Sequence, residues 1–216
     1  MRSGYVIDDR LFATYQNGIS EVKDGKLVEL AIIKNDKFFS RYPTDLIAYG
    51  SYLYVVGRHA GLHIFKINKD ILEFVGNITS GFTPTDLHWE VPGKMLLLTG
   101  NEDVILVDTS VPEKAKRLKS TKISGIQLSE EGIYRRDEEI LVAGSILNNA
   151  NSDLIVAVLE SMMPYKVVKK QKIKGFGNVK KDSETSFNEF VGFIVKDDTL
   201  LMFTKCPMGT FEGVIK

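Results

Sequence analysis

The chain is poor in the residues that stabilise small disulfide-bonded or metal-binding proteins. Its 216 residues include one cysteine (Cys206), one tryptophan (Trp89), three histidines and six prolines. A single cysteine excludes an internal disulfide and fits a protein of the reducing cytoplasm, where we expect this chain. The three histidines are scattered, whereas zinc needs ligands that converge, so we expect no metal site and no cofactor.

Neither sign of charge dominates, since 28 basic and 28 acidic residues give a formal net charge of zero. General binding to nucleic acid or to a membrane surface needs a basic excess, so the sequence predicts neither, although a local basic patch stays open. No apolar run approaches the ~20 residues of a membrane span. The N-terminus lacks the apolar core of a signal peptide. Abundant lysine and glutamate with little glutamine is typical of thermophiles, and an AT-rich genome gives a similar bias.

What the sequence does contain is a repeat. Five apolar runs of strand length begin 42, 43, 44 and 60 residues apart, at Leu11, Leu53, Leu96, Ile140 and Leu200. A period of roughly 40–50 residues built from short strands is typical of a β-propeller, in which each blade is a small antiparallel sheet. We therefore predict an all-β fold, a single β-propeller domain of five blades with about four strands each. The expected blade ranges are 4–34, 43–79, 84–123, 126–174 and 188–216.

The second unit shows the strand pattern most clearly. Runs at 45–49, 52–57, 62–67 and 72–78 are separated by turns rich in Gly, Asn and Asp, as in consecutive hairpins. The third unit repeats the layout, and its Pro84-Thr85-Asp86-Leu87 echoes Pro43-Thr44-Asp45-Leu46.

The fifth unit shows three runs, at 190–195, 200–204 and 211–215. This last blade can therefore be incomplete. An open strand edge invites pairing with another chain, and pairing with a second copy of this chain would give a homo-oligomer. The simpler alternative is a three-stranded blade whose edge is protected by Lys205 and Lys216.

Two segments carry a resemblance to a known repeat. Gly61-Leu62-His63-Ile64-Phe65 and the run from Val104 through Asp108 to Pro112 resemble the LVIVD-type propeller repeats. The aspartate of that pattern occurs here only in the third unit, and five units are fewer than is usual in that family. The resemblance implies a binding scaffold and transfers no catalytic residue, because its motif consists of structural positions.

Two long irregular connections, 145–153 and 174–188, supply the leading functional hypothesis. One joins the second and third strands of the fourth unit, and the other leads from that unit to the fifth, so in a propeller both emerge on one face. The Arg58-His59 turn belongs to the same face. We predict a non-enzymatic scaffold that binds a protein partner there, unless both are simply solvated loops. The candidate contact residues are Arg58, His59, Asn148, Asn149, Asn151, Phe176, Asn178, Lys180, Lys181 and Phe187.

Two alternatives stay open. An enzyme or small-ligand binder, such as a carbohydrate-active propeller, would use an axial pocket with Asp45, Asp86, His88 and Trp89. A nucleic-acid accessory factor would use Phe176 with Lys180 and Lys181, pairing stacking with positive charge. The chain has no Gly-rich nucleotide loop, and acidic pairs such as Asp8-Asp9 fall where hairpin turns favour aspartate.

Overall fold

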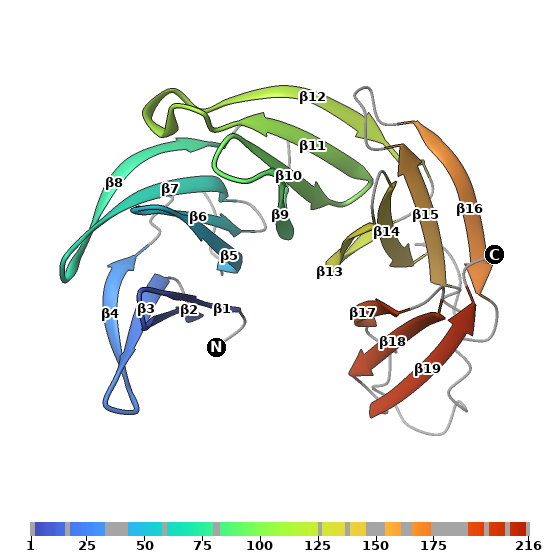
Figure 1. Cartoon of the computed structure of the whole chain (residues 1–216), viewed down its shortest axis with the longest axis horizontal. Coiled ribbons are helices and arrows are strands. Elements are labelled where there is room, and N and C mark those ends of the chain that lie inside the picture. Colours follow the sequence, from blue (N-terminus) through green and yellow to red (C-terminus); the bar gives the residue numbers. More distant parts are fainter. Residues whose placement is uncertain are drawn as a thin grey trace. The chain divides into compact units, whose positions relative to one another are not determined.

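The computed structural model describes strands joined by short turns (Figure 1). The described residues are 3–15, 18–32, 43–57, 60–79, 83–124, 127–136, 139–145, 154–160, 166–173, 190–196, 199–205 and 208–214. They form nineteen strands and one 3-10 turn, η1 (Pro112–Lys114). Within these ranges no helix has the length and apolar character needed to cross a membrane.

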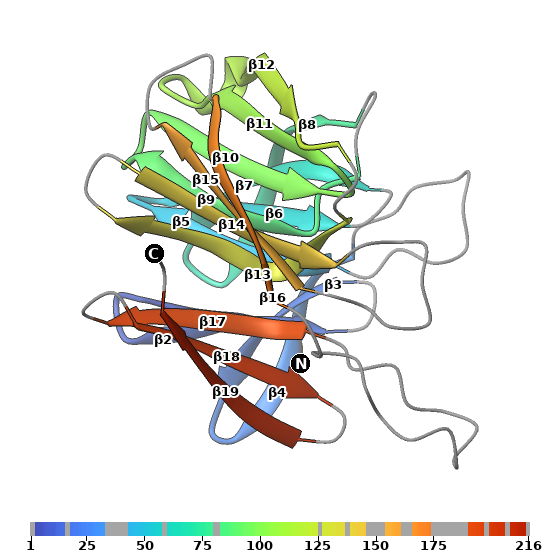
Figure 2. The same ribbon diagram turned by 90° about the vertical axis from the view of Figure 1, so that its right-hand side faces the viewer.

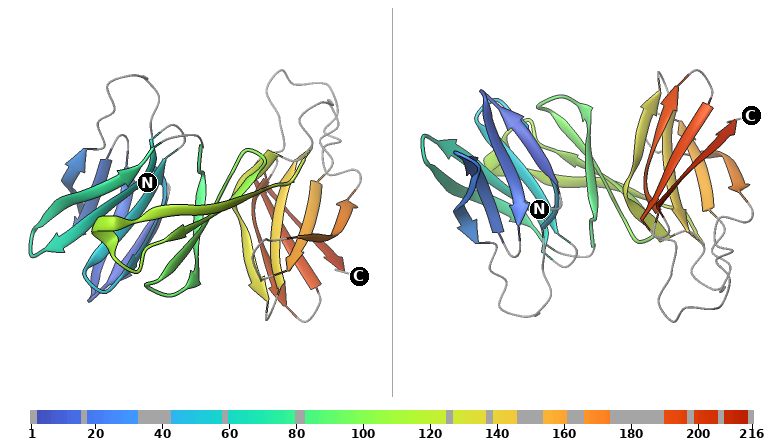
Figure 3. Two further views of the ribbon diagram at one scale, coloured as in Figure 1. Left: turned by 90° about the horizontal axis from the view of Figure 1, so that it is seen from above. Right: turned by 90° about the horizontal axis from the view of Figure 1, so that it is seen from below.

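The strands form five antiparallel sheets, which we number as blades 1 to 5 in chain order. Blade 1 comprises β1 (Gly4–Ile7), β2 (Arg10–Tyr15), β3 (Gly18–Lys23) and β4 (Lys26–Ile32). Blade 2 comprises β5 (Pro43–Tyr49), β6 (Tyr52–Gly57), β7 (Gly61–Asn68) and β8 (Ile71–Ile78). Blade 3 comprises β9 (Asp86–Val91), β10 (Met95–Gly100), β11 (Asp103–Asp108) and β12 (Lys116–Lys122). Each sheet keeps the strand order of the chain, so every blade is a meander (Figure 3).

Blades 4 and 5 follow the same plan (Figure 2). Blade 4 comprises β13 (Gln127–Arg136), β14 (Glu139–Ser145), β15 (Leu154–Glu160) and β16 (Val167–Ile173). Blade 5 comprises β17 (Phe190–Lys196), β18 (Thr199–Lys205) and β19 (Met208–Val214). The last blade thus has three strands in the described part of the chain, as the sequence indicated.

The chain divides into two compact units, residues 1–100 with 104–120 and residues 101–103 with 121–216. In the first unit β1 contacts β5 and β5 contacts β9, so the first strands of successive blades are neighbours. In the second unit β13 likewise contacts β17. Successive meanders that meet through their first strands are blades, so the chain has the predicted β-propeller fold. The prediction of a single domain stays a prediction.

The packing of blade 2 explains why the sequence shows continuous apolar runs in place of alternating apolar and polar residues. In β6, Leu53 and Val55 belong to a core shared with blade 1, and Tyr54 and Val56 belong to a core shared with blade 3. Successive side chains on a strand point to opposite faces, so a strand covered on both faces must be apolar throughout. Each fully buried side chain of this size contributes roughly 1.5–3 kcal/mol.

The hairpin turns account for the acidic pair at the start of the chain. Asp8 and Asp9, the two residues between β1 and β2, have φ of 47° and 63°. Positive φ at both central positions is what a type I′ turn requires, and aspartate tolerates this conformation better than most residues. The conformation of the turn therefore accounts for Asp8 and Asp9 without a catalytic function.

Candidate functional site

The predicted partner-binding residues lie outside the described residues. This holds for Arg58, His59, Asn148, Asn149, Asn151, Phe176, Asn178, Lys180, Lys181 and Phe187. The structure does fix the strand ends from which the two long connections leave. Leu154 pairs with Ser145 on one side and with Ile173 on the other, so both connections leave the same end of blade 4.

The inner-strand acids are held by backbone groups. The Asp45 carboxylate accepts a hydrogen bond from the backbone N–H of Leu46 at 2.8 Å and from that of Leu87, on the neighbouring blade, at 3.3 Å. It also accepts a bond from the Ser3 hydroxyl. The Asp86 carboxylate accepts the backbone N–H of Leu87 at 2.8 Å. These contacts link β5 to β9, so Asp45 has a structural function.

The threonines of the two Pro-Thr-Asp-Leu motifs act in the same way. The Thr44 hydroxyl donates to the Val56 carbonyl and the Thr85 hydroxyl to the Thr99 carbonyl, each at 3.3 Å. In both blades the motif therefore ties the first strand to the second. The repetition visible in the sequence reflects this shared structural requirement.

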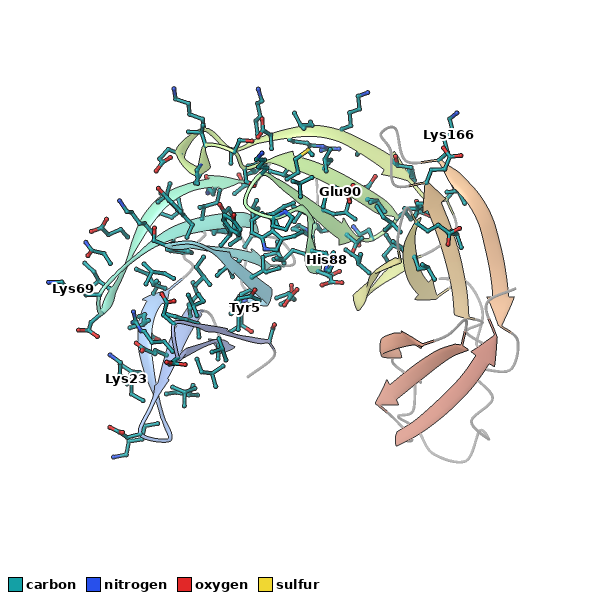
Figure 4. All side chains as sticks on the ribbon, in the orientation of Figure 1. Tyr5, Lys23, Lys69, His88, Glu90 and Lys166 are labelled. Carbon is teal, nitrogen blue, oxygen red and sulfur yellow. The ribbon has the colours of Figure 1, made fainter. Side chains whose placement is uncertain are left out.

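Of the four axial-pocket residues, Asp45 and Asp86 accept the same backbone N–H, that of Leu87, whereas Trp89 lies on the other face of β9. Trp89 packs in the core between blades 2 and 3, with its ring centroid 5.7 Å from that of Tyr49 and 5.2 Å from that of Tyr54. His88 (labelled in Figure 4) precedes it on β9 and, like Asp86, lies on the opposite face of the strand. Burial raises the pKa of Tyr54 to about 12, so this phenol stays protonated in the core.

A cavity that sequence reasoning missed lies between blades 1 and 2. Its volume is about 210 Å³, and it lies at the end of the blades that carries the turn between first and second strands. Turns from both blades contribute to it. Its lining residues are Ile7, Asp8, Arg10, Phe12, Gly50, Ser51, Ile67 and Lys69.

An ion-pair network borders this cavity. The Arg10 guanidinium donates from Nε and Nη2 to the two carboxylate oxygens of Glu21, at 2.7 and 2.8 Å. Lys23 lies 3.2 Å from Glu21 and 2.7 Å from Asp70, and the second contact joins blade 1 to blade 2. The guanidinium also sits 4.9 Å from the centroid of the Phe12 ring, within reach of a cation–π interaction.

The ion-pair network shifts the pKa values of its members in the directions expected for paired charges. The hydrogen bond from Arg10 lowers the pKa of Glu21, against the opposing effect of burial. The hydrogen bond from Lys23 lowers the pKa of Asp70, and the same contact raises the pKa of Lys23. All four groups are therefore charged near neutral pH, and Arg10 is held in a fixed orientation at the cavity wall.

Exposed apolar side chains flank the network on both blades. Val28 is 41% exposed and pairs with Glu21, which in turn pairs with Phe12 of the shared core. Phe74 is 59% exposed and pairs with Phe65, also of that core. Directly paired residues share a face of the sheet, so both apolar side chains lie on the facing sides of the two blades. We call Val28, Phe74, the ion-pair network and the cavity that the network borders the blade 1–2 groove.

The groove holds no evident metal site. In the described part of the chain no group of histidine, cysteine and carboxylate side chains could hold an ion. His63, which with His88 is one of two histidines on the described strands, is buried, and its Nε2 lies 2.8 Å from the Ala60 carbonyl. Burial lowers the pKa of His63.

Comparison with known proteins places the chain by fold alone. No family model matches it, and no curated protein matches its sequence, so the LVIVD resemblance stays a prediction. It is similar to the computationally designed Ika8 protein, with a TM-score of 0.53, 9% identity and coverage of 99% of this chain and 70% of that one. It is also similar to a chain in the complex of S. cerevisiae Dbp5 bound to Nup159 and Gle1, with a TM-score of 0.50, 7% identity and coverage of 98% and 59%.

A third similar structure is PorZ, a surface component of the type-IX secretion system of Porphyromonas gingivalis. Its TM-score is 0.52 at 14% identity, with coverage of 96% of this chain and 26% of PorZ. This chain thus spans less than two thirds of the Dbp5-complex chain and of PorZ. At such low identities the likeness concerns the arrangement of blades and leaves function to the residues.

Proposed function

We propose that this chain is a non-enzymatic propeller scaffold that binds a protein partner. The observation that carries the proposal is the blade 1–2 groove, where Val28 and Phe74 stay exposed on either side of an ordered ion-pair network. Single exposed apolar residues are ordinary, but two on the facing sides of neighbouring blades, beside an ordered network of charges, form the kind of surface that marks protein interfaces. Arg10 adds a guanidinium, a group enriched at such interfaces.

The inner strands support a binding function over a catalytic one. Asp45 and Asp86 accept backbone N–H groups, and Trp89 is separated from Asp86 and His88 by strand alternation. General acid–base chemistry needs groups that converge on one substrate position. The similar chain in the Dbp5 complex belongs to an assembly of proteins, which is in keeping with a scaffold function.

The second part of the proposal concerns the face carrying 145–153 and 174–188. Both connections leave one end of blade 4, and we propose that one partner contacts both. We propose that residues of these loops, Phe176 and Phe187 among them, contribute apolar contacts. A cytoplasmic location and assembly through the last blade stay predictions.

The test is affinity purification of the tagged chain, with bound proteins quantified by mass spectrometry. A groove variant (Val28→Ser with Phe74→Ser) and a loop variant (Phe176→Ser with Phe187→Ser) are compared with wild type. Val111→Ser is the matched control, because Val111 is 50% exposed and lies outside both surfaces. We expect the same partner to be depleted about tenfold or more by the groove or the loop variant, and retained by the control. Equal recovery with all four proteins would refute the proposal.

A further inference from the structure

The outer strand of blade 3 carries an unusual run of positive charge. Residues 116–120 of β12 are all exposed, and Lys114 of η1, just before the strand, is exposed as well. The segment 114–120 contains Lys114, Lys116, Arg117 and Lys119 and no acidic residue. We call these four residues the basic edge. In a chain with zero net charge, β12 shares this feature with β16, the edge strand of blade 4, which carries Lys169, Lys170 and Lys172 and no acidic residue.

Among the strands that the structure describes, β12 has a neighbour on one side only. The strand order β12-β11-β10-β9 leaves β12 at the edge of its sheet. An edge strand presents backbone N–H and C=O groups that can pair with another strand, and charged residues often serve to prevent this. The edge strands differ in composition, because β16 is also rich in lysine, whereas β8 has one charged residue, Glu73, and leaves Ile71 and Phe74 exposed.

We propose that β12 binds an acidic extended segment of another protein by strand addition. The segment would complete the hydrogen-bond ladder at the open edge, and its carboxylates would meet Lys116, Arg117 and Lys119. Leu118, 43% exposed, shares a face of the strand with Lys116 and supplies an apolar contact there, whereas Arg117 and Lys119 lie on the other face. The inference goes beyond the proposed function, since it names the chemistry of a partner and uses a surface separate from the blade 1–2 groove.

A nucleic acid fits this edge less well than a peptide does. Phosphate oxygens accept hydrogen bonds from lysine and arginine, but a phosphodiester backbone offers no donor to the carbonyl groups of β12. A peptide strand satisfies both kinds of backbone group at once. The geometry therefore favours an acidic polypeptide, and an oligonucleotide becomes a control.

The experiment measures binding of short synthetic peptides by fluorescence anisotropy at low and high salt. The probe alternates Glu with Val and Thr, one control peptide carries Lys in place of Glu, and another has prolines that block strand pairing. We expect only the first peptide to bind, with an affinity that falls as salt rises. Hydrogen exchange should slow at the amides of β12 when it binds.

Charge reversal supplies the decisive comparison. K116E/R117E/K119E should weaken binding about tenfold or more. The matched control K26E/K66E/K94E changes the net charge equally at exposed lysines elsewhere, and should leave affinity within about twofold. Circular dichroism establishes that both variants are folded.

Four outcomes would overturn the proposal. They are no binding at about 1 mM peptide, unchanged binding after K116E/R117E/K119E, equal binding of the proline peptide, and tighter binding of oligo-dT than of the acidic peptide. Self-association through β12, detected by sedimentation, would identify a second copy as the occupant and would also contradict it. The groove variant should bind the peptide as wild type does. If the peptide experiment fails, the groove proposal is unaffected, and if the groove experiment fails, the β12 proposal is unaffected.

Discussion

Replacing Glu21 with glutamine tests the ion-pair network of the groove directly. The Glu21 side chain is 4% exposed and receives two hydrogen bonds from Arg10. Glutamine keeps the size of the side chain and one acceptor oxygen, so the substitution removes the charge with little change in packing. Arg10 then loses its counterion inside the blade interface.

The expected loss of stability follows from the exposure of the partners. Breaking a fully buried ion pair costs about 3–5 kcal/mol, whereas exposed pairs contribute about 0.2–1 kcal/mol. Arg10 is 26% exposed, so water partly solvates the orphaned guanidinium. We therefore expect Glu21→Gln to lower the free energy of unfolding by about 2 kcal/mol, between these limits. Asp70→Asn is the control, because Asp70 is 79% exposed and its loss should not be measurable.

The pH dependence adds an independent check. The folded pKa of Glu21 lies below its ordinary value, so its stabilisation is present above that ordinary value and is lost as pH falls through the folded pKa. Urea unfolding between about pH 3 and 7 should show this loss in wild type and a shallower one in the variant. A cost under about 0.5 kcal/mol for Glu21→Gln, or a cost equal to that of Asp70→Asn, would refute the reasoning.

Two further predictions concern the packing of blade 2. Gly61 has φ of 78°, and a Cβ there would lie 2.1 Å from the Ile78 carbonyl oxygen, so Gly61→Ala must displace β8. It should cost at least about 2 kcal/mol more, in urea unfolding, than Gly50→Ala, where φ is also positive but the Cβ meets nothing within 4 Å. Equal costs would contradict the steric argument. His63 is buried and its pKa is lowered, so stability should decline as pH falls below the ordinary histidine value. His63→Gln should flatten that decline between about pH 7 and 5, and an unchanged slope would show that another group titrates.

The fold could be predicted because each blade repeats a local pattern. The second strand of blade 2 was expected at 52–57 and runs from Tyr52 to Gly57. Its neighbours match within one or two residues, since turn residues mark the ends of strands whose two faces are both covered. The three-stranded last blade followed from the same pattern. These features depend on residues close in sequence, which is why one chain sufficed.

The groove could not be predicted because its parts meet only after the blades pack. Lys23 and Asp70 are 47 residues apart, and their contact depends on how two sheets are placed against each other. The sequence pointed instead to the long connections 145–153 and 174–188 and, as an alternative, to the inner-strand acids, of which Asp45 proved to bind backbone N–H groups. Polar residues in a repeat satisfy the backbone as readily as they form sites, and spacing alone does not separate the two functions.

The repeat itself supplies a way to separate polar residues that satisfy the backbone from polar residues that form a binding site. Aligning the apolar runs at Leu11 and Leu53 places Arg10 at the position of Tyr52 and Phe12 at that of Tyr54. Glu21 pairs with Phe12, and Ile64 pairs with Tyr54, so blade 1 carries a buried ion pair where blade 2 carries an aromatic and an aliphatic residue. A propeller blade therefore folds without these charges, and a buried pair is weak as a source of stability compared with apolar packing of similar volume. By contrast, Asp45 and Asp86 recur because blades 2 and 3 share that backbone contact. The residues that break the repeat, not those that follow it, are the ones whose presence a binding function explains.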